Sequence, residues 1–442
     1  MNPTINRITR RSIDSAWTDL PDAPSGNTRL MLGVDSGGGS PSLAHHVERW
    51  GALPYRRASD LVDELDRSGL RGHGGAWFPV ATKWRAVQSA RGRAPVVVAN
   101  GAEGEPASGK DRFLIRHRPH LILDGTAAAA SALGAFRVVV HVPSDGVGPM
   151  NRAIAERQRK SVDPCPIDIV VAPDRFLAGQ ESAVVNTING RTAGIPSFVG
   201  LRPVRERGVG GRPTLVQNVE TLAHVALVAR FGHEWFRSVG VPGSPGTALL
   251  TVTGHWPTPR IVEVPLGATL GQLLGLSRQD LGSLQGVLFG GYGGGWVTPN
   301  QAAETPLNEE ALQSLGSSLG AGVVVLLPQG PCPLAEAARI IRYLEGEGAG
   351  QCGPCVHGLA ELAAAVELLA FQPRALRGSV PAIETLCGLV EGRGACRHPD
   401  GASRNVRTML RTFSSHVDVH LRRGPCPPIR SILPVPVPRR NL

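Results

Sequence analysis

The chain has 442 residues, of which 42% are hydrophobic, and this length is too great for one hydrophobic core, so two or three domains are expected. Its formal net charge is +10, from 46 Lys and Arg against 36 Asp and Glu. Aromatic residues make up only 5% and do not interleave with basic ones, which argues against nucleic-acid binding and favours a basic face for an acidic protein partner.

Residues 1–55 are polar and rich in Gly and Pro, which predicts an irregular N-terminal lead-in. The first 22 residues have no apolar signal core. No run of about 18 apolar residues is visible, so no membrane span is expected. We therefore expect a cytoplasmic protein.

The stretch Gly69–Trp84 is the most informative part of the sequence. Four glycines fall between Gly69 and Gly75, Lys83 follows, and a helix is predicted over 84–89. Glycine amides approach an anion closely, and a helix N-terminus and a lysine add positive charge, so these are the parts of a phosphate cradle. No Gly-Lys-Ser/Thr closes it as in a P-loop, and no strand precedes it as in the dinucleotide fingerprint. A plain turn remains the alternative.

Strands and helices alternate over residues 56–240, which predicts an α/β, Rossmann-like domain with a parallel sheet covered on both faces. The predicted strands are 95–100, 137–142 and 167–171, and the predicted helices are 58–66, 120–133, 180–188 and 218–228. The first strand leads into a charged loop at the end of a sheet strand, where ligands bind in such folds. A solvated turn is the alternative. The charged residues of this loop are Glu103, Glu105, Lys110, Asp111 and Arg112.

The pattern changes after residue 240. Strands at 247–253, 260–264, 287–290 and 323–327 with a helix at 269–276 predict a small β-grasp domain over 241–330. Helices at 334–344, 359–369, 382–390 and 406–417 predict a four-helix bundle over 331–423. The tail 424–442 is rich in proline and arginine and is predicted to dock on a partner.

Three of the seven cysteines have a metal-ligand spacing. Cys352 and Cys355 are three apart before the 359–369 helix, and Cys396 lies in the loop between the last two helices. This arrangement suits an iron–sulfur cluster. Zinc, a thiol–disulfide pair and simple buried thiols are the alternatives. Cys332 and Cys387 are predicted core positions, and Cys426 lies in the tail.

Several motifs, in order, resemble those of the flavin-carrying, NADH-oxidising subunit of respiratory complex I and its relatives in soluble hydrogenases and formate dehydrogenases. They are Gly69–Trp84, Asn100–Arg112, Gly179–Ala183 and Pro213–Leu222, with part of the C-terminal cysteine pattern. The resemblance covers residues 50 to 425. It implies an FMN-binding domain, a ubiquitin-like β-grasp domain and a helical bundle that holds one [4Fe–4S] cluster.

The resemblance also implies which residues form the site. FMN and its surroundings would contact Gly72, His73, Gly74, Gly75, Lys83, Asn100, Glu103, Glu105, Gly179, Glu181 and Asn218. Phe78 would pack over the nicotinamide of NADH, and Glu103, Glu181 and Phe78 would act in catalysis. Cys352, Cys355 and Cys396 would hold the cluster.

The chain departs from the family pattern on the side of the nucleotide. His73 replaces an arginine and Trp77 a glycine beside the flavin. The other replacements are Ala102 for aspartate, Phe176 for tyrosine, Gln180 for glutamate, Gln217 for asparagine and Val204 for phenylalanine. These changes favour retained FMN binding over retained NADH binding.

The cluster motif also departs, because Ala349 stands where the first family cysteine belongs. Three thiolates suit a [3Fe–4S] cluster, or a [4Fe–4S] cluster with a fourth ligand of another kind. The candidates for this ligand are Glu347, His357, His398 and Cys426.

We expect an electron-transfer flavoprotein that takes electrons from NADH or another donor. The expected acceptor is a ferredoxin-like carrier or a membrane flavocytochrome, which would place the protein at the inner face of the cell membrane. The alternative is a cluster-bearing scaffold or relay subunit whose nucleotide site is blocked by Trp77.

Overall fold

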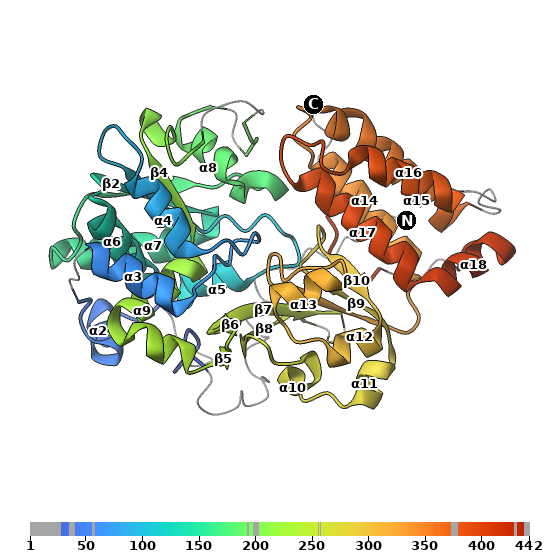
Figure 1. Cartoon of the computed structure of the whole chain (residues 1–442), viewed down its shortest axis with the longest axis horizontal. Coiled ribbons are helices and arrows are strands. Elements are labelled where there is room, and N and C mark those ends of the chain that lie inside the picture. The colour runs from blue at the N-terminus through green and yellow to red at the C-terminus, as the bar shows by residue number, and fades with distance from the viewer. Residues whose placement is uncertain are drawn as a thin grey trace.

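The computed structural model describes residues 28–34, 40–54, 58–191, 194–197, 203–254, 256, 258–372, 379–427 and 431–436. A parallel α/β unit, a mixed sheet with short helices and a C-terminal helical region follow one another along the chain and meet at the centre of the molecule (Figure 1). The predicted contacts of Arg430, Arg439 and Arg440 in the tail lie outside the described residues.

The first sheet is fully parallel, with strand order β3-β2-β1-β4. Its strands are β1 Val96–Asn100, β2 Arg137–Val142, β3 Ile167–Val171 and β4 Thr214–Asn218. All residues of the central strand β1 and of the edge strand β4 are buried, as expected of strands covered on both faces. The prediction of a parallel α/β domain is confirmed, but β4 was not predicted, because its two polar C-terminal residues interrupt a short apolar run.

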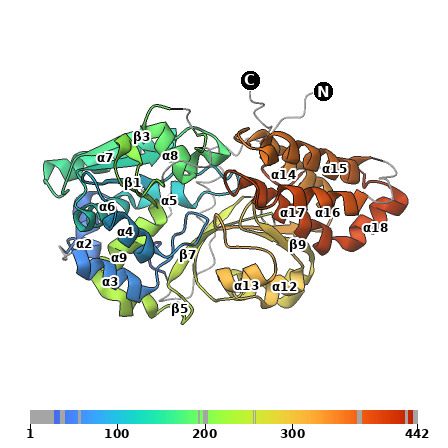
Figure 2. The same ribbon diagram turned by 45° about the horizontal axis from the view of Figure 1, so that its top comes forward.

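Helices cover both faces of this sheet (Figure 2). The larger core lies against α3 Ala58–Ser68, α4 Val80–Gln88, α6 Pro119–Leu133, α7 Val147–Arg159 and α9 Val219–Arg237. A smaller core lies under α8 Glu181–Ile188. The remaining helix of the unit, α5 Lys110–His117, follows the charged loop after β1.

The sequence analysis predicted that residues 1–55 are irregular, but part of this lead-in is helical. Helix α2 Leu43–Trp50 begins at Ser42, whose side chain accepts a hydrogen bond from the amide of His45. The preceding segment is held to the mixed sheet by Glu263, whose carboxylate accepts hydrogen bonds from the amides of Arg29, Leu30 and Met31 at 2.8–2.9 Å.

The second sheet is mixed, with strand order β10-β9-β11-β7-β8. β11 Val323–Pro328 runs parallel to β7 Thr247–Thr253 and antiparallel to β9 Leu284–Phe289. The edge strands are β8 Arg260–Pro265 and β10 Gly295–Val297. Four short helices accompany the sheet: α10 Leu270–Leu274, α11 Arg278–Gly282, α12 Pro299–Glu304 and α13 Glu309–Ser314.

The C-terminal region contains five α-helices among the described residues, one more than predicted. They are α14 Pro333–Gly346, α15 Leu359–Phe371, α16 Ser379–Val390, α17 His398–Thr412 and α18 Ser414–Arg423. The predicted helix over 406–417 is divided at Phe413, which is buried beside Trp296 with ring centroids 5.3 Å apart. Helix α15 has an apolar stripe that is buried in this region's core and consists of Leu359, Leu362, Val366 and Leu369.

One helical stretch of the described chain, Pro354–Phe371, is long and apolar enough to cross a membrane. It is not an uninterrupted apolar run, because it contains His357, Glu361 and Glu367. The stretch includes α15, and 44% of it is buried inside the protein, as in the core helix of a folded domain.

A buried ion cluster joins the parallel unit to the mixed sheet. The ammonium of Lys110 donates to Asp111 at 2.8 Å and to Glu220 at 2.7 Å, and Glu220 also accepts from the amide of Leu249 in β7 at 2.8 Å. Burial opposes the charge of Lys110, but the two carboxylates outweigh it and raise its pKa. The positive charge is therefore fixed where the two sheets meet.

The variant Lys110→Met should leave two buried carboxylates without their cation and lower stability by about 3–5 kcal/mol. A urea unfolding curve measures this loss. Lys160→Met, at an exposed lysine, is the matched control and should change stability by less than about 0.5 kcal/mol. Equal curves for the two variants would contradict the role of the cluster.

Candidate functional site

One cavity of about 1260 Å³ opens where the three parts of the chain meet. Its wall includes the glycine segment 72–78, the loop after β1, the start of α8 and the end of β4. The mixed-sheet unit adds residues around 290–293 and 317–321, and the helical region adds 394–398. The phosphate-cradle candidate and the loop of Cys396 therefore line the same hollow.

The glycine segment leaves free space on its cavity side. A Cβ added to Gly75 would meet no described protein atom within 4 Å, while the φ of +103° at this residue still requires glycine. A Cβ at Gly74 would lie 3.2 Å from Asn218 Cβ. The segment thus packs closely on the start of α9 at one residue and faces open space at the next.

Trp77 lines the cavity, but its side chain is largely buried in the mixed-sheet unit. Its indole is 3% exposed, belongs to the core of the mixed-sheet unit and donates from Nε1 to the carbonyl of Gly320 at 3.2 Å. Its φ is +50°, a left-handed conformation that favours glycine, and burial of the large ring offsets the strain. This packing argues against the alternative in which Trp77 blocks the nucleotide site.

His73 is buried between two rings. Its imidazole lies 4.7 Å from the Trp77 ring and 5.0 Å from that of His224, measured between centroids. Burial and the charge of Lys110 lower its pKa to about 3. A neutral imidazole thus stands where the resembling family has a permanent positive charge.

Lys83 supplies positive charge at the cavity wall. Its ammonium donates to the carbonyl of Val216 at 2.7 Å and pairs with Glu181 at 2.9 Å, and about 30% of its side chain is exposed. Glu181 is the first residue of α8, whose N-cap is Gln180. Gly179 lies beside Ala102, since a Cβ at Gly179 would come within 2.9 Å of that residue's carbonyl oxygen.

Three predicted site residues use their polar atoms within the protein. Both carboxylate oxygens of Glu103 accept from the start of α5, where the amides of Asp111 and Arg112 lie at 3.0 and 3.1 Å. Asn100 donates to the carbonyl of Gly179 at 2.9 Å. Asn218 caps α9 and donates to Asp111 at 2.8 Å. These side chains shape the loops, so Glu103 has the geometry of a helix cap rather than of a free base.

Phe78 and Glu105, two further predicted residues, differ from each other in exposure. Phe78 is 52% exposed at the cavity wall, which leaves its ring available for stacking. Glu105 is 8% exposed and accepts from the amide of Tyr292 at 2.9 Å. Burial raises its pKa to about 7, against the opposing effect of hydrogen bonds from Tyr292 and Ala107.

Cys396 lines this cavity, and Cys352 and Cys355 lie close enough to Cys396 for the three thiols to interact. Burial and the neighbouring thiols of Cys352 and Cys396 raise the pKa of Cys355 to about 12. Backbone amides of Ala349 and His398 donate to the sulfurs of Cys355 and Cys396. Amide hydrogen bonds to cysteine sulfur are a recurring feature of iron–sulfur sites.

The four candidates for a further cluster ligand differ in their surroundings. His357 is exposed, and Glu347 accepts from the amide of Phe176 at 2.9 Å. His398 donates from Nε2 to the carbonyl of Leu344 at 2.7 Å, and its buried Nδ1 has no hydrogen-bond partner in the described part of the chain. Cys426 lies instead against His416 and His420.

The sequence analysis missed cavity residues from the two later parts of the chain. Arg404 of α17 donates to the carbonyl of Gly293 at 3.3 Å, and Glu309 and Ser318 also line the hollow. No local pattern marks these residues, because only the packing of distant units brings them to the cavity.

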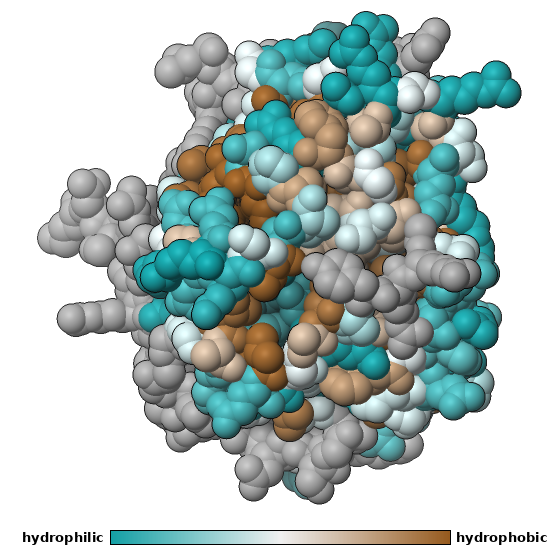
Figure 3. All heavy atoms as spheres, turned by 90° about the vertical axis from the view of Figure 1, so that its left-hand side faces the viewer, coloured by the Kyte–Doolittle hydropathy of each residue, from teal (hydrophilic) through white to brown (hydrophobic). Residues whose placement is uncertain are grey.

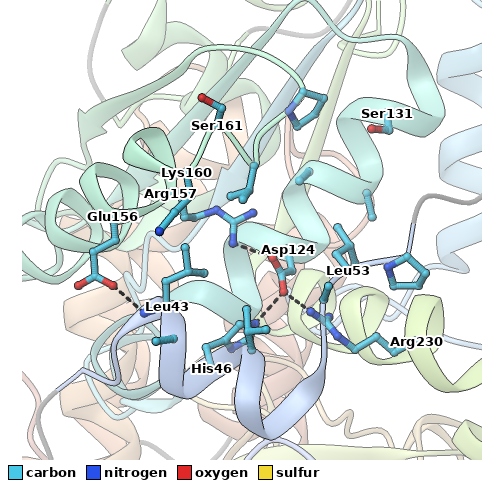
Figure 4. Close-up of a pocket in the computed structure, with 18 of the residues that line it drawn as sticks. Leu43, His46, Leu53, Asp124, Ser131, Glu156, Arg157, Lys160, Ser161 and Arg230 are labelled. Carbon is cyan, nitrogen blue, oxygen red and sulfur yellow. Dashed lines mark hydrogen bonds and ion pairs between the residues drawn. The ribbon is translucent and has the colours of Figure 1, made fainter.

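A second hollow of about 1080 Å³ lies between α2, α6 and α7 and contains none of the predicted site residues. Figure 3 shows apolar side chains gathered on this side of the molecule. At its wall Asp124 is held by His46 at 2.7 Å, by Arg157 at 2.6 Å and by Arg230 (Figure 4). This carboxylate is fully paired, and it ties α2, α6, α7 and α9 together.

Comparison with known proteins agrees with the division of the chain. Residues 65–227 match the model of the Nuo51 FMN-binding domain, and residues 335–420 match that of the NADH-ubiquinone oxidoreductase-F iron–sulfur binding region. The chain is 30% identical over 426 residues to the F 2 subunit of the NADH-quinone oxidoreductase of Rhizobium meliloti, covering 92% of this chain and 97% of that one. Identity to the F subunit of the corresponding enzyme of Rickettsia rickettsii is 26%, over 82% of this chain and 89% of that one.

A solved structure is also similar. An air-oxidized NAD+-reducing [NiFe]-hydrogenase contains a chain that superposes with a TM-score of 0.74 and 28% identity. The match covers 85% of this chain and 65% of the hydrogenase chain.

Glu105 should make stability depend on pH. Its pKa in the folded protein is about 7, above the ordinary value of 4.5, so it contributes stability below about pH 4.5 that is lost as pH rises through 7. Glu105→Gln should remove this loss, so the melting temperature of the wild type should fall relative to that of the variant between pH 5 and 8. Glu310→Gln, at an exposed carboxylate, is the control. A pH-independent difference between wild type and Glu105→Gln would contradict the burial argument.

Proposed function

The chain belongs to the family of the F subunits of NADH-quinone oxidoreductases, a family of NADH dehydrogenase-type oxidoreductases with FMN and a [4Fe–4S] cluster, and from this membership we propose how its own residues carry out electron transfer. FMN takes two electrons from a nicotinamide and releases them one at a time. The observation that carries the proposal is the single cavity that reaches from the glycine segment to Cys396.

The cavity wall fits FMN. Gly75 borders open space, and Lys83 supplies a positive charge for a phosphate. Because His73 is buried and neutral, Lys83 carries the electrostatic part of this interaction, and the glycine amides supply the hydrogen bonds. Gly72, Gly74, Asn100, Gly179, Glu181 and Asn218 complete the proposed FMN site.

The same cavity has room for a nicotinamide nucleotide. The exposed ring of Phe78 suits stacking on a planar heterocycle, and Glu105 lies in the wall nearby. Glu103 acts in this proposal by holding the loop after β1 to α5 rather than by moving a proton. The scaffold alternative rested on a Trp77 that blocks the site, and the packing of this indole in the mixed-sheet core removes its support.

Cys352, Cys355 and Cys396 are the proposed cluster ligands, and we propose His398 as the fourth. A carbonyl oxygen can only accept, so His398 carries its proton on Nε2 and presents a bare Nδ1. A buried bare nitrogen without a partner is costly unless it coordinates something. Ala349, at the missing cysteine's place, donates its amide to Cys355 but offers no ligand atom.

The proposed organisation assigns 56–240 to the FMN and NADH domain, 241–330 to a β-grasp domain and 331–423 to the cluster-bearing helices. The mixed sheet, with β7 and β11 parallel at its centre, supports the β-grasp assignment. The protein would work as a peripheral subunit of a larger complex. Its acceptor would be a ferredoxin-like carrier or a membrane flavocytochrome, in keeping with the net charge of +10.

NADH should bleach the flavin absorbance of the anaerobically purified protein. The variant Phe78→Ala should bind FMN normally. Reduction of its bound FMN at low NADH concentration should be at least tenfold slower, because the variant lacks the ring on which the nicotinamide would stack. Phe136→Ala, at an exposed phenylalanine outside the cavity, should behave like the wild type. Bound flavin that no pyridine nucleotide bleaches would overturn the NADH assignment.

The variant His398→Gln keeps a side-chain donor for the carbonyl of Leu344 but removes the nitrogen ligand. It should lower the iron content or change the cluster's EPR signal, with FMN content unchanged. His357→Gln, at an exposed histidine next to the motif, is the control. An identical EPR spectrum and iron content in wild type and His398→Gln would exclude His398 as a ligand.

A further inference from the structure

Two cysteines that the cluster does not use meet two histidines at the end of the helical region. Cys332 is the N-cap of α14, His416 and His420 lie one turn apart on α18, and Cys426 follows that helix. One ligand atom from each lies within 4.8 Å of all the others. Sequence separation hides this group, because Cys332 is 84 residues from the nearest of its partners.

The distances within this group match one metal ion. Cys332 Sγ lies 3.6 Å from His416 Nε2 and 3.4 Å from His420 Nε2. Cys426 Sγ lies 3.2 and 3.4 Å from the same two nitrogens. A tetrahedral zinc ion with bonds of about 2.3 Å to sulfur and about 2.0–2.1 Å to nitrogen separates these ligand atoms by about 3.5 Å.

The hydrogen-bond geometry of His420 favours metal coordination. Its Nδ1 donates to the carbonyl of Leu369 at 3.1 Å, so the neutral ring has a bare Nε2. This one lone pair lies within 3.4 Å of Cys332 Sγ, Cys426 Sγ and the amide of Cys426, which is more than one acceptor can serve. A histidine whose second nitrogen is fixed by a carbonyl is the usual arrangement around a bound metal.

We propose that Cys332, His416, His420 and Cys426 bind a structural zinc ion. Binding releases the two thiol protons to solvent, and the two thiolates then neutralise the dication. Four protein ligands close the coordination sphere, as in structural rather than catalytic zinc sites. A two-iron centre with the cysteines on one iron and the histidines on the other does not fit, because every sulfur lies within 3.6 Å of both nitrogens.

The ion would fasten the end of the chain to the helical region. Cys426 leads into residues 431–436, where the hydroxyl of Ser431 donates to Glu336 of α14 at 2.8 Å and Leu433 is buried. His420 is buried, whereas His416 and Cys426 are half-buried, so zinc can reach the site from the surface. The site therefore joins α14, α15, α18 and the C-terminal segment without a disulfide.

Metal analysis of the full-length protein, purified with a thiol reductant, tests this proposal. The wild type should hold about one zinc per chain, and Cys426→Ser and His416→Gln should hold at least tenfold less. Cys165→Ser, at a half-buried thiol in the parallel α/β unit, should keep its zinc. Iron and FMN, measured in the same samples, should not change, so a failure of the electron-transfer proposal is seen separately.

X-ray absorption at the zinc edge of the wild type keeps the test decisive if a variant does not fold. Two sulfur and two nitrogen ligands are expected. A zinc-free wild type, full zinc in both variants, a zinc shell without sulfur, or a Cys332–Cys426 disulfide in the reduced preparation would each overturn the proposal.

Discussion

The buried charge of Lys110 fixes how the two sheets meet. A lysine enters such a place only when paired, and its two carboxylates come from different elements, Asp111 from α5 and Glu220 from α9. Each carboxylate has a further partner, since Asp111 accepts from Asn218 and Glu220 from the amide of Leu249. The floor of the large cavity is therefore a network in which loop, helix and sheet hold one another, and the glycine segment rests on it.

Two departures from the family pattern, Trp77 and His73, lie next to this network. Trp77 and His73 line the cavity, and their rings pack toward the mixed sheet and α9. They change the contact between the parallel α/β unit and the mixed-sheet unit. The replacement of an arginine by His73 also removes one positive charge from the glycine segment. Lys83, paired with Glu181 but partly exposed, remains as a cation at the wall. The changed residues Ala102, Phe176, Gln180 and Gln217 also line the cavity, and the open space next to Gly75 is retained.

Short sequence patterns predicted the individual strands and helices. The β-branched runs of β1, β2 and β11 and the apolar stripe of α15 indicated buried elements, because burial on one or both faces leaves a short-range signature. The run of β3 indicated a strand that is only partly buried. β4 was missed because its C-terminal residues serve α9: Asn218 is both the end of the strand and the helix cap. The roles of Glu103 and Trp77 could not be predicted from the sequence for a different reason. They depend on which amide or carbonyl, distant in the sequence, each side chain contacts in the fold.

The cysteines illustrate the same limit and suggest a division of labour. Cys352 and Cys355 lie near Cys396, which lines the large cavity, and there hydrogen bonds to sulfur and a nearby flavin would matter for electron transfer. Cys332 and Cys426 join two histidines at the other cysteine site, where a redox-inactive ion with a closed coordination sphere contributes stability alone. Helices α14 to α18 form a small layer that positions the loop of Cys396 at the cavity. An ion that fixes the last helix to the first holds that layer together, and its zinc cannot take up the electrons that pass beside it.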